Sequence, residues 1–148
     1  MWENPILYQW DSGLQTGYDK IDNQHKQLIG MVNKLIEASS SGKSADVVTE
    51  ALDFLAGYAI MHFGDEEKLQ IDFAYPDYYS HKSKHDDFRV VVGKLVRQVK
   101  KEGPTEKLIE EVCNTIGSWL LEHIMGDDFR MAKFVKAADD AKALTKKE

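Results

Sequence analysis

The stretch His81-Lys82-Ser83-Lys84-His85 decides the fold of this chain, together with His62-Phe63-Gly64-Asp65-Glu66. An α-helix turns by about 100° per residue, so side chains four positions apart lie on the same face, one turn along. The first stretch therefore places two imidazoles on one helix face, and the second places an imidazole beside a carboxylate. Two such pairs on two helices are what a metal centre inside a helical bundle requires.

Periodic apolar residues around these pairs predict four long helices, over residues 19–38, 45–71, 77–101 and 105–125. A shorter helical piece is expected over 128–143. Ser44 and Thr105 are candidate N-caps, and Asp19 or Asp22 can cap the first helix. Because no alternating apolar and polar run is bounded by hairpin turns, we expect no strands.

Four helices with short connections pack best as an antiparallel up-down-up-down four-helix bundle. We therefore assign the chain to the all-α class, as a single domain over residues 1–148. Residues 1–18 form an arm, 19–125 the bundle and 126–148 a C-terminal segment with the short helix. The arm contains Trp2, Tyr8, Trp10 and Tyr18, so we expect it to lie against the bundle. The charged stretch 139–148 is expected to be a solvated tail.

The composition limits the class of protein. A net charge of −6 and the lack of a basic stripe argue against nucleic-acid binding. Cys113, the single cysteine, cannot form an internal disulfide and lies in an apolar-periodic run, so we expect a buried structural thiol. The chain has no run of 18 apolar residues and no basic, apolar leader at its start, so no membrane association is expected. The expected location is the cytoplasm.

The five histidines are distributed over all four expected helices: His25, His62, His81, His85 and His123. They fall early in the first and third helices and late in the second and fourth. Because neighbouring helices of an up-down bundle run in opposite directions, all five come to the same end. A single histidine is more often a core residue that forms ordinary hydrogen bonds. Independent core histidines would have no reason to agree in height, so their agreement favours a metal site.

The number of candidate ligands indicates two metal ions. Five imidazoles, Glu66 and a carboxylate near His123 make seven ligands, too many for one ion. The lack of clustered cysteines excludes iron–sulfur and zinc-ribbon sites. Imidazole with carboxylates favours iron and leaves copper, manganese and zinc open. The ferritin-like Glu-x-x-His pattern is missing. A mostly neutral ligand set favours lower oxidation states, which suits an oxygen carrier more than an oxygenase.

The order of these residues resembles the hemerythrin family, especially its bacterial members. The shared pattern is a lone His in the first helix, then His-x3-Glu, His-x3-His and His-x4-Asp. Seven residues match it: His25, His62, Glu66, His81, His85, His123 and Asp128. The neighbouring words Asp22-Asn23-Gln24-His25 and Glu66-Glu67 match as well, and the resemblance covers about residues 8–135.

The resemblance implies a four-helix bundle with two iron ions joined by an oxo or hydroxo bridge, binding dioxygen reversibly for storage, delivery or sensing. Glu66 and Asp128 would bridge the ions. One ion would be completed by His81, His85 and His123. The other would be held by His25 and His62, with an open position for dioxygen.

The carboxylate on the fourth helix is the weakest part of this pattern. Asp128 follows His123 by five residues, about 140° around an ideal helix, whereas Asp127 follows by four and points better. A wide turn or π-bulge near Gly126 would swing Asp128 inward, and such bulges are common at functional sites. The resemblance favours Asp128, with Asp127 as the alternative.

The same motif positions imply an apolar oxygen pocket beside the ion held by two histidines, formed by Leu28, Phe63, Trp119, Leu120 and Ile124. Core packing explains these residues equally well. A dry pocket would slow the proton-driven loss of bound dioxygen as peroxide. An oxidase or peroxidase would need a channel and a proton relay, and neither is identified, so we expect no enzyme. An oxygen-responsive or redox-responsive signalling module would need a separate protein partner.

Overall fold

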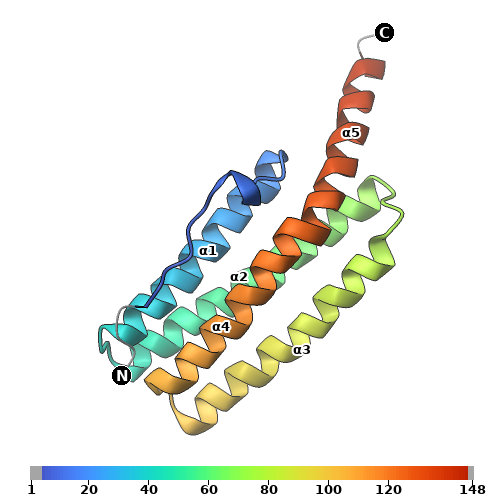
Figure 1. Cartoon of the computed structure of the whole chain (residues 1–148). Coiled ribbons are helices and arrows are strands. Elements are labelled where there is room, and N and C mark those ends of the chain that lie inside the picture. The colour runs from blue at the N-terminus through green and yellow to red at the C-terminus, as the bar shows by residue number, and fades with distance from the viewer. Residues whose placement is uncertain (1–4, 147–148) are drawn as a thin grey trace.

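The computed structural model describes residues 5–146, so Trp2 of the expected arm and the end of the expected tail lie outside the described residues. Its long helices are α1 (Asp19–Ser40), α2 (Ala45–Asp72), α3 (Tyr78–Glu102) and α4 (Glu106–His123). They run alternately up and down, joined by short loops (Figure 1). The predicted all-α four-helix bundle is confirmed, and the described residues contain no strand.

The bundle interior is one continuous apolar core that holds the helices in register. Helices α1 and α3 do not pack extensively on each other, and each lies between α2 and α4. Leu35 on α1, Leu55 on α2, Phe88 on α3 and Ile109 on α4 are at most 1% exposed. Burying a side chain of this kind contributes about 1.5–3 kcal/mol. Cys113 lies in the same core, and burial raises the pKa of its thiol to about 12, which fits a structural role.

Two of the expected helix caps are confirmed and one is wrong. Ser44 accepts a hydrogen bond from the Val47 amide, and Thr105 accepts one from Leu108. Neither Asp19 nor Asp22 caps α1, because Tyr18 occupies that position without a side-chain hydrogen bond. The Asp22 carboxylate is buried and accepts hydrogen bonds from the Thr16 amide (2.8 Å) and hydroxyl (2.7 Å), so it anchors the arm instead.

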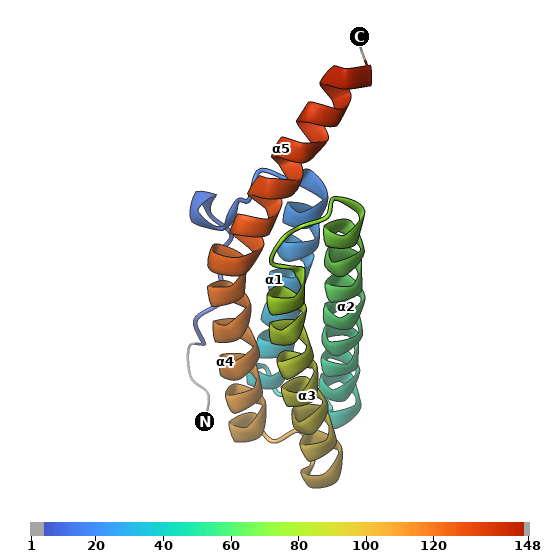
Figure 2. The ribbon, with the colours of Figure 1, turned by 90° about the vertical axis from the view of Figure 1, so that its right-hand side faces the viewer.

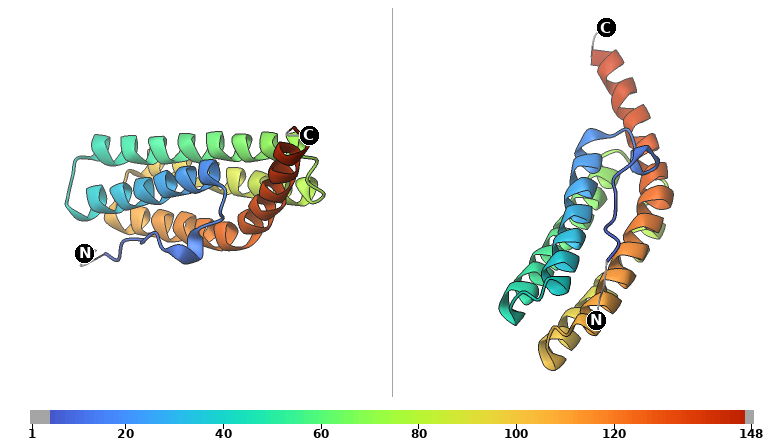
Figure 3. Two further views of the ribbon diagram at one scale, coloured as in Figure 1. Left: turned by 90° about the horizontal axis from the view of Figure 1, so that it is seen from above. Right: turned by 60° about the vertical axis from the view of Figure 1, so that its left-hand side comes forward.

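The N-terminal arm lies along the seam between α1 and α4, as expected (Figure 3). Its backbone is held by Asn33 of α1, whose amide group donates to the Tyr8 carbonyl and accepts from the Tyr8 amide, both at 2.8 Å. The Tyr8 ring lies against Gly117 of α4, in contact close enough that only glycine fits there. A short 3-10 helix, η1 (Ser12–Leu14), ends the arm and buries Leu14.

Helix α4 ends at His123, close to the expected Met125, and leads without a loop through a π-helical turn, η2 (Ile124–Asp128), into α5 (Phe129–Lys146). The start of α5 buries Met131, Ala132 and Val135 in a second apolar cluster with Ile21 and Tyr75. The rest projects past the bundle as a free helix (Figure 2). The C-terminal helix begins one residue after its expected start at 128 and ends three residues after its expected end at 143, so it includes most of the stretch that was expected to be a tail.

In the part of the chain that the structure describes, no helix combines the length and apolar character needed to cross a bilayer. The cytoplasmic location stays a prediction.

Replacing Gly117 with alanine should release the arm. The new methyl group would collide with the Tyr8 ring and hydroxyl, which lie directly against Gly117. Overpacking of this kind costs about 1–3 kcal/mol, which urea unfolding would measure as a lower midpoint. Gly57→Ala is the matched control, since Gly57 lies in α2 with open space around it. That variant should gain up to about 1 kcal/mol from helix propensity. Equal stabilities for the two variants would contradict the proposed fit of the arm.

Candidate metal centre

The seven predicted ligand residues come together at one end of the bundle, inside it. They come from every long helix and from η2, and none is more than 4% exposed: His25, His62, Glu66, His81, His85, His123 and Asp128. Their ligand atoms form two groups that share both carboxylates. We call these the three-histidine group (His81, His85 and His123 with Glu66 and Asp128) and the two-histidine group (His25 and His62 with the same carboxylates).

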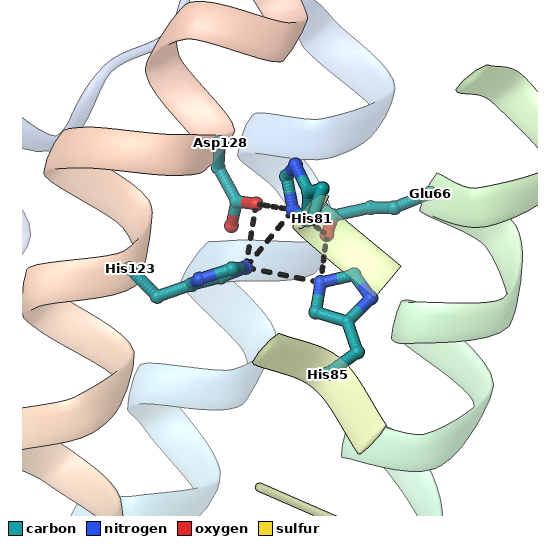
Figure 4. A group of neighbouring side chains, drawn as sticks. All are labelled: Glu66, His81, His85, His123 and Asp128. Atoms are coloured by element: carbon teal, nitrogen blue, oxygen red, sulfur yellow. Dashed lines mark hydrogen bonds and ion pairs between the residues drawn. The ribbon is translucent and has the colours of Figure 1, made fainter. Parts of the chain in front are cut away.

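In the three-histidine group, the imidazole Nε2 atoms all point to one spot (Figure 4). His123 Nε2 lies 3.0 Å from the Nε2 atoms of both His81 and His85. Asp128 Oδ1 approaches His81 Nε2 at 2.9 Å and His123 Nε2 at 3.0 Å. Glu66 Oε1 lies 3.2 Å from His85 Nε2. Five ligand atoms thus surround a single point.

The two-histidine group uses the other oxygen of each carboxylate. Asp128 Oδ2 lies 2.9 Å from His25 Nε2. Glu66 Oε2 lies 3.4 Å from His25 Nε2 and 3.2 Å from His62 Nε2. Each carboxylate therefore spans the two groups, with one oxygen on each side, which is the arrangement of a bridging ligand.

The arrangement of the ligand atoms suits the binding of two cations better than it suits hydrogen bonding among the side chains. His123 Nε2 lies 3.0 Å from two other imidazole nitrogens, and a ring nitrogen with one proton or one lone pair can form an aligned hydrogen bond with only one of them. Among the described residues, His25 Nε2, both oxygens of Glu66 and Asp128 Oδ1 are fully buried without an aligned hydrogen-bond partner. Orphaned polar atoms of this kind are destabilising. A cation in each group would accept their lone pairs, and the imidazole and carboxylate set suits iron.

The π-helical turn η2 decides which aspartate enters the site. Its wider turn carries Asp128 inward to 1% exposure, as the expected bulge would. Asp127 remains at the surface side and lies 3.3 Å from His123 Nδ1, on the far side of the ring. It is also paired with Lys84 (2.8 Å) and Arg130 (2.6 Å). Asp127 is therefore placed behind a candidate ligand and not among the ligand atoms.

Two further residues orient the imidazoles from behind, and the sequence analysis missed both. Gln24 Oε1 lies 2.7 Å from His62 Nδ1, and Glu67 Oε2 lies 2.9 Å from His85 Nδ1. Arg89 holds Glu67 at 2.7 Å. Outer partners of this kind fix the ring orientation and tautomer of a metal ligand. The sequence signal for these two residues was weak. Each directly adjoins a predicted ligand in a stretch that resembles the family, but the resemblance gave neither residue a role.

Gln70 was also missed. It is fully buried, and its side-chain amide has no hydrogen-bond partner among the described residues. It continues the four-residue series His62, Glu66, Gln70 along the inner face of α2. That spacing was the available signal, although it does not identify a role for the amide.

The electrostatics of the group show how strongly the buried carboxylates attract positive charge. Burial lowers the pKa of His25, but the Asp128 and Glu66 carboxylates outweigh it and raise the pKa to about 9. The same balance raises the pKa of His81 to about 9. Burial raises the pKa of Glu66, yet its histidine neighbours, His62 first, hold that pKa well below the usual value. Burial also raises the pKa of Asp128, but its histidine neighbours hold that pKa below the usual value, so both carboxylates are ionised and attract cations.

The five residues expected to form an oxygen pocket lie in or against the core, four of them buried: Leu28, Phe63, Trp119, Leu120 and Ile124. Trp119 is the partly exposed one, and its ring stacks on His123 at 4.3 Å between centroids. Phe63 stacks on His85 at 4.2 Å and also lies near His62, at 5.9 Å. The two aromatic rings therefore stack on the three-histidine group. Their part in an oxygen pocket stays a prediction.

Comparison with known proteins gives one consistent family. Residues 16–135 match the family model "Hemerythrin HHE cation binding domain". The chain is 36% identical to a bacteriohemerythrin of Stenotrophomonas maltophilia over 133 residues, covering 88% of this chain and 83% of the relative. It is 29% identical to a myohemerythrin of Theromyzon tessulatum, covering 88% and 95%. A crystal structure of wild-type hemerythrin superposes with a TM-score of 0.78 at 26% identity, covering 88% of this chain and 98% of that chain.

The chain stripped of metal should lose stability as the pH rises from about 6.5 to 9. A histidine whose pKa is raised to about 9 in the folded state, as for His25 and His81, binds its proton more tightly there than in the unfolded chain, where the pKa is about 6.5. This stabilisation is complete below pH 6.5 and is lost as the pH passes 9. Thermal unfolding in chelator at several pH values measures it. A melting temperature that is constant or rises over this range would contradict the assignment.

Proposed function

The chain belongs to the hemerythrin HHE cation-binding family, and on this premise we propose that it binds dioxygen reversibly at two iron ions. The three-histidine group would hold one ion and the two-histidine group the other, with Glu66 and Asp128 as bridges. Several bacterial relatives are named bacteriohemerythrin, and similarity to them supports dioxygen as the ligand of this chain. Storage, delivery or sensing of oxygen would each use this binding.

One observation carries the proposal: both carboxylates divide their oxygens between the two groups. Glu66 directs Oε1 to His85 and Oε2 to His62. Asp128 directs Oδ1 to His81 and Oδ2 to His25. A single-ion site would not need the second pair of oxygens, and a core histidine cluster would not need the carboxylates.

The two groups differ in the number of ligands they offer. The three-histidine group presents five ligand atoms and the two-histidine group four. The group with fewer protein ligands is the side on which we propose that dioxygen enters. When bound, the two iron ions would transfer electrons to dioxygen and would take them back when dioxygen is released. The protein residues hold the ions with five neutral and two anionic ligands and keep water away from them.

We propose a binding protein and not an enzyme. The side chains expected beside the two-histidine group, Leu28, Phe63, Leu120 and Ile124, are buried and apolar and offer no proton to a reacting substrate. Proton relay through ordered polar groups is what an oxidase or peroxidase at the same site would require. Turnover of peroxide with a reductant would support the enzyme instead.

A spectroscopic titration tests the proposed function directly. The chain is loaded with iron, reduced anaerobically and exposed to oxygen, while visible absorption and iron content are recorded. We expect two iron ions per chain and a charge-transfer band that appears with oxygen and disappears when oxygen is removed. Stoichiometric zinc in the purified chain, or no bound metal, would contradict the proposal.

Trp119 is the partly exposed residue among the five expected in the oxygen pocket. Its ring is stacked between Phe88 (3.9 Å) and His123 (4.3 Å). It also lines a surface pocket of about 170 Å³ whose other walls are Lys84, Glu122, His123 and Asp127. The ring thus covers one face of His123, which itself forms part of the pocket wall.

Trp119→Ala should therefore speed autoxidation of the oxygen-loaded protein, about tenfold, because removing the ring admits water from the pocket and proton transfer to bound oxygen follows. The decay of the charge-transfer band measures the rate. Trp10→Ala is a matched control, since Trp10 lies in the arm and packs on the outside of the core. If both variants decay at the rate of the unmodified chain, Trp119 does not protect the centre.

A further inference from the structure

We propose that the two metal positions differ in affinity, and that the outer residues Glu67 and Asp127 make the three-histidine position the tight one and leave the two-histidine position labile. This inference rests on the proposed two-metal site. It assigns Glu67, Asp127 and Gln24 as positioning residues, because each acts on the metal through an imidazole and not by direct contact.

The three-histidine group is backed by carboxylates. Glu67 Oε2 lies 2.9 Å from His85 Nδ1, and Glu67 is only 12% exposed on its side chain. Asp127 Oδ2 lies 3.3 Å from His123 Nδ1. Both carboxylates are fixed in place, Glu67 by Arg89 at 2.7 Å and Asp127 by Lys84 and Arg130. Two of the three imidazoles therefore face an anchored negative charge.

The two-histidine group has no such backing. His62 Nδ1 faces the neutral amide of Gln24 at 2.7 Å, and the Asp65 carboxylate lies one hydrogen bond farther out, 2.8 Å from the Gln24 nitrogen. His25 Nδ1 is buried with no hydrogen-bond partner among the described residues. Neither imidazole of this group therefore has a carboxylate as the direct partner of its Nδ1 atom.

This difference bears on metal affinity. A carboxylate behind an imidazole raises the basicity of the ligating nitrogen and holds the ring in place, and loss of such a partner typically costs about 10–100-fold in affinity. The three-histidine group has two such partners and one more ligand atom, so both effects act in the same direction. Repulsion between two cations would also separate two binding steps, but it does not determine which position is emptied first.

The test removes zinc from the 148-residue chain in steps. The chain is loaded with Zn²⁺ and dialysed against graded chelator, bound zinc is counted by elemental analysis, and the imidazole signals are followed by ¹⁵N NMR. At one zinc per chain, we expect the signals of His25 and His62 to return to their metal-free positions. The signals of His81, His85 and His123 should stay in their metal-bound positions.

Variants then identify the cause. Glu67→Gln and Asp127→Asn keep the shape of each side chain and remove its charge, and each should weaken only the tighter zinc by about 10-fold or more. The double variant Gln24→Glu, Asp65→Asn exchanges amide and carboxylate behind His62 without changing the net charge. It should tighten only the labile zinc by a similar factor. Asp86→Asn is the matched control, because Asp86 pairs with the same Arg89 (2.7 Å) but with no imidazole.

The outcomes separate this inference from the proposed function. Release of His81, His85 and His123 at the first step would overturn it, and so would variants that shift both zinc ions equally or neither. In those cases, a count of two zinc ions per chain would still support the two-metal site. If the unmodified chain holds fewer than two zinc ions, the two-metal site itself is wrong, and the inference falls with it.

Discussion

Two buried carboxylates set the conditions under which this bundle folds. Glu66 and Asp128 are each 1% exposed, and an ionised carboxylate in a protein interior costs several kcal/mol, on the order of the whole stability of a domain, unless it is compensated. The compensation comes from five imidazoles on four helices, and cations would complete it. Each helix must therefore present its histidine at the same height. The alternating direction of the helices meets that condition, with histidines early in α1 and α3 and late in α2 and α4.

The same constraint explains the irregularity in the last long helix. In an ideal α-helix, Asp128 would point about 140° away from His123, yet it lies 3.0 Å from His123 Nε2 because η2 is a wider π-turn. The turn has a second effect. It leaves Asp127 on the opposite side of the ring, 3.3 Å from His123 Nδ1. One local distortion thus places a carboxylate at each nitrogen of one imidazole, one aspartate inside the group of ligand atoms and one behind it.

Spacing made the inner face of the site predictable, because residues four apart share a helix face whatever surrounds them. That rule gave the pairs His62–Glu66 and His81–His85, and helix direction gave their common height. Contacts between elements are a different matter. Asp22 is a residue type that favours the N-cap position, but its carboxylate accepts hydrogen bonds from the Thr16 amide and hydroxyl of the arm instead. No local pattern shows that the arm would supply these donors. Nor does any local pattern reveal that the first turns of α5 pack on Ile21 and Tyr75 from distant parts of the chain.

The outer residues show why site and fold form together. Gln24, Glu67 and Asp127 each directly adjoin a candidate ligand in sequence, so they point about 100° away from it, toward a seam between helices. From there Gln24 of α1 reaches His62 of α2, and Glu67 of α2 reaches His85 of α3. Two of the helices, α1 and α2, therefore each orient an imidazole of the next helix, and no helix carries a complete ligand position alone. A shift of α2 along the bundle axis would displace Glu66 from the other ligand atoms and Glu67 from His85 at the same time. The packing of the core and the geometry of the centre are therefore fixed by the same register.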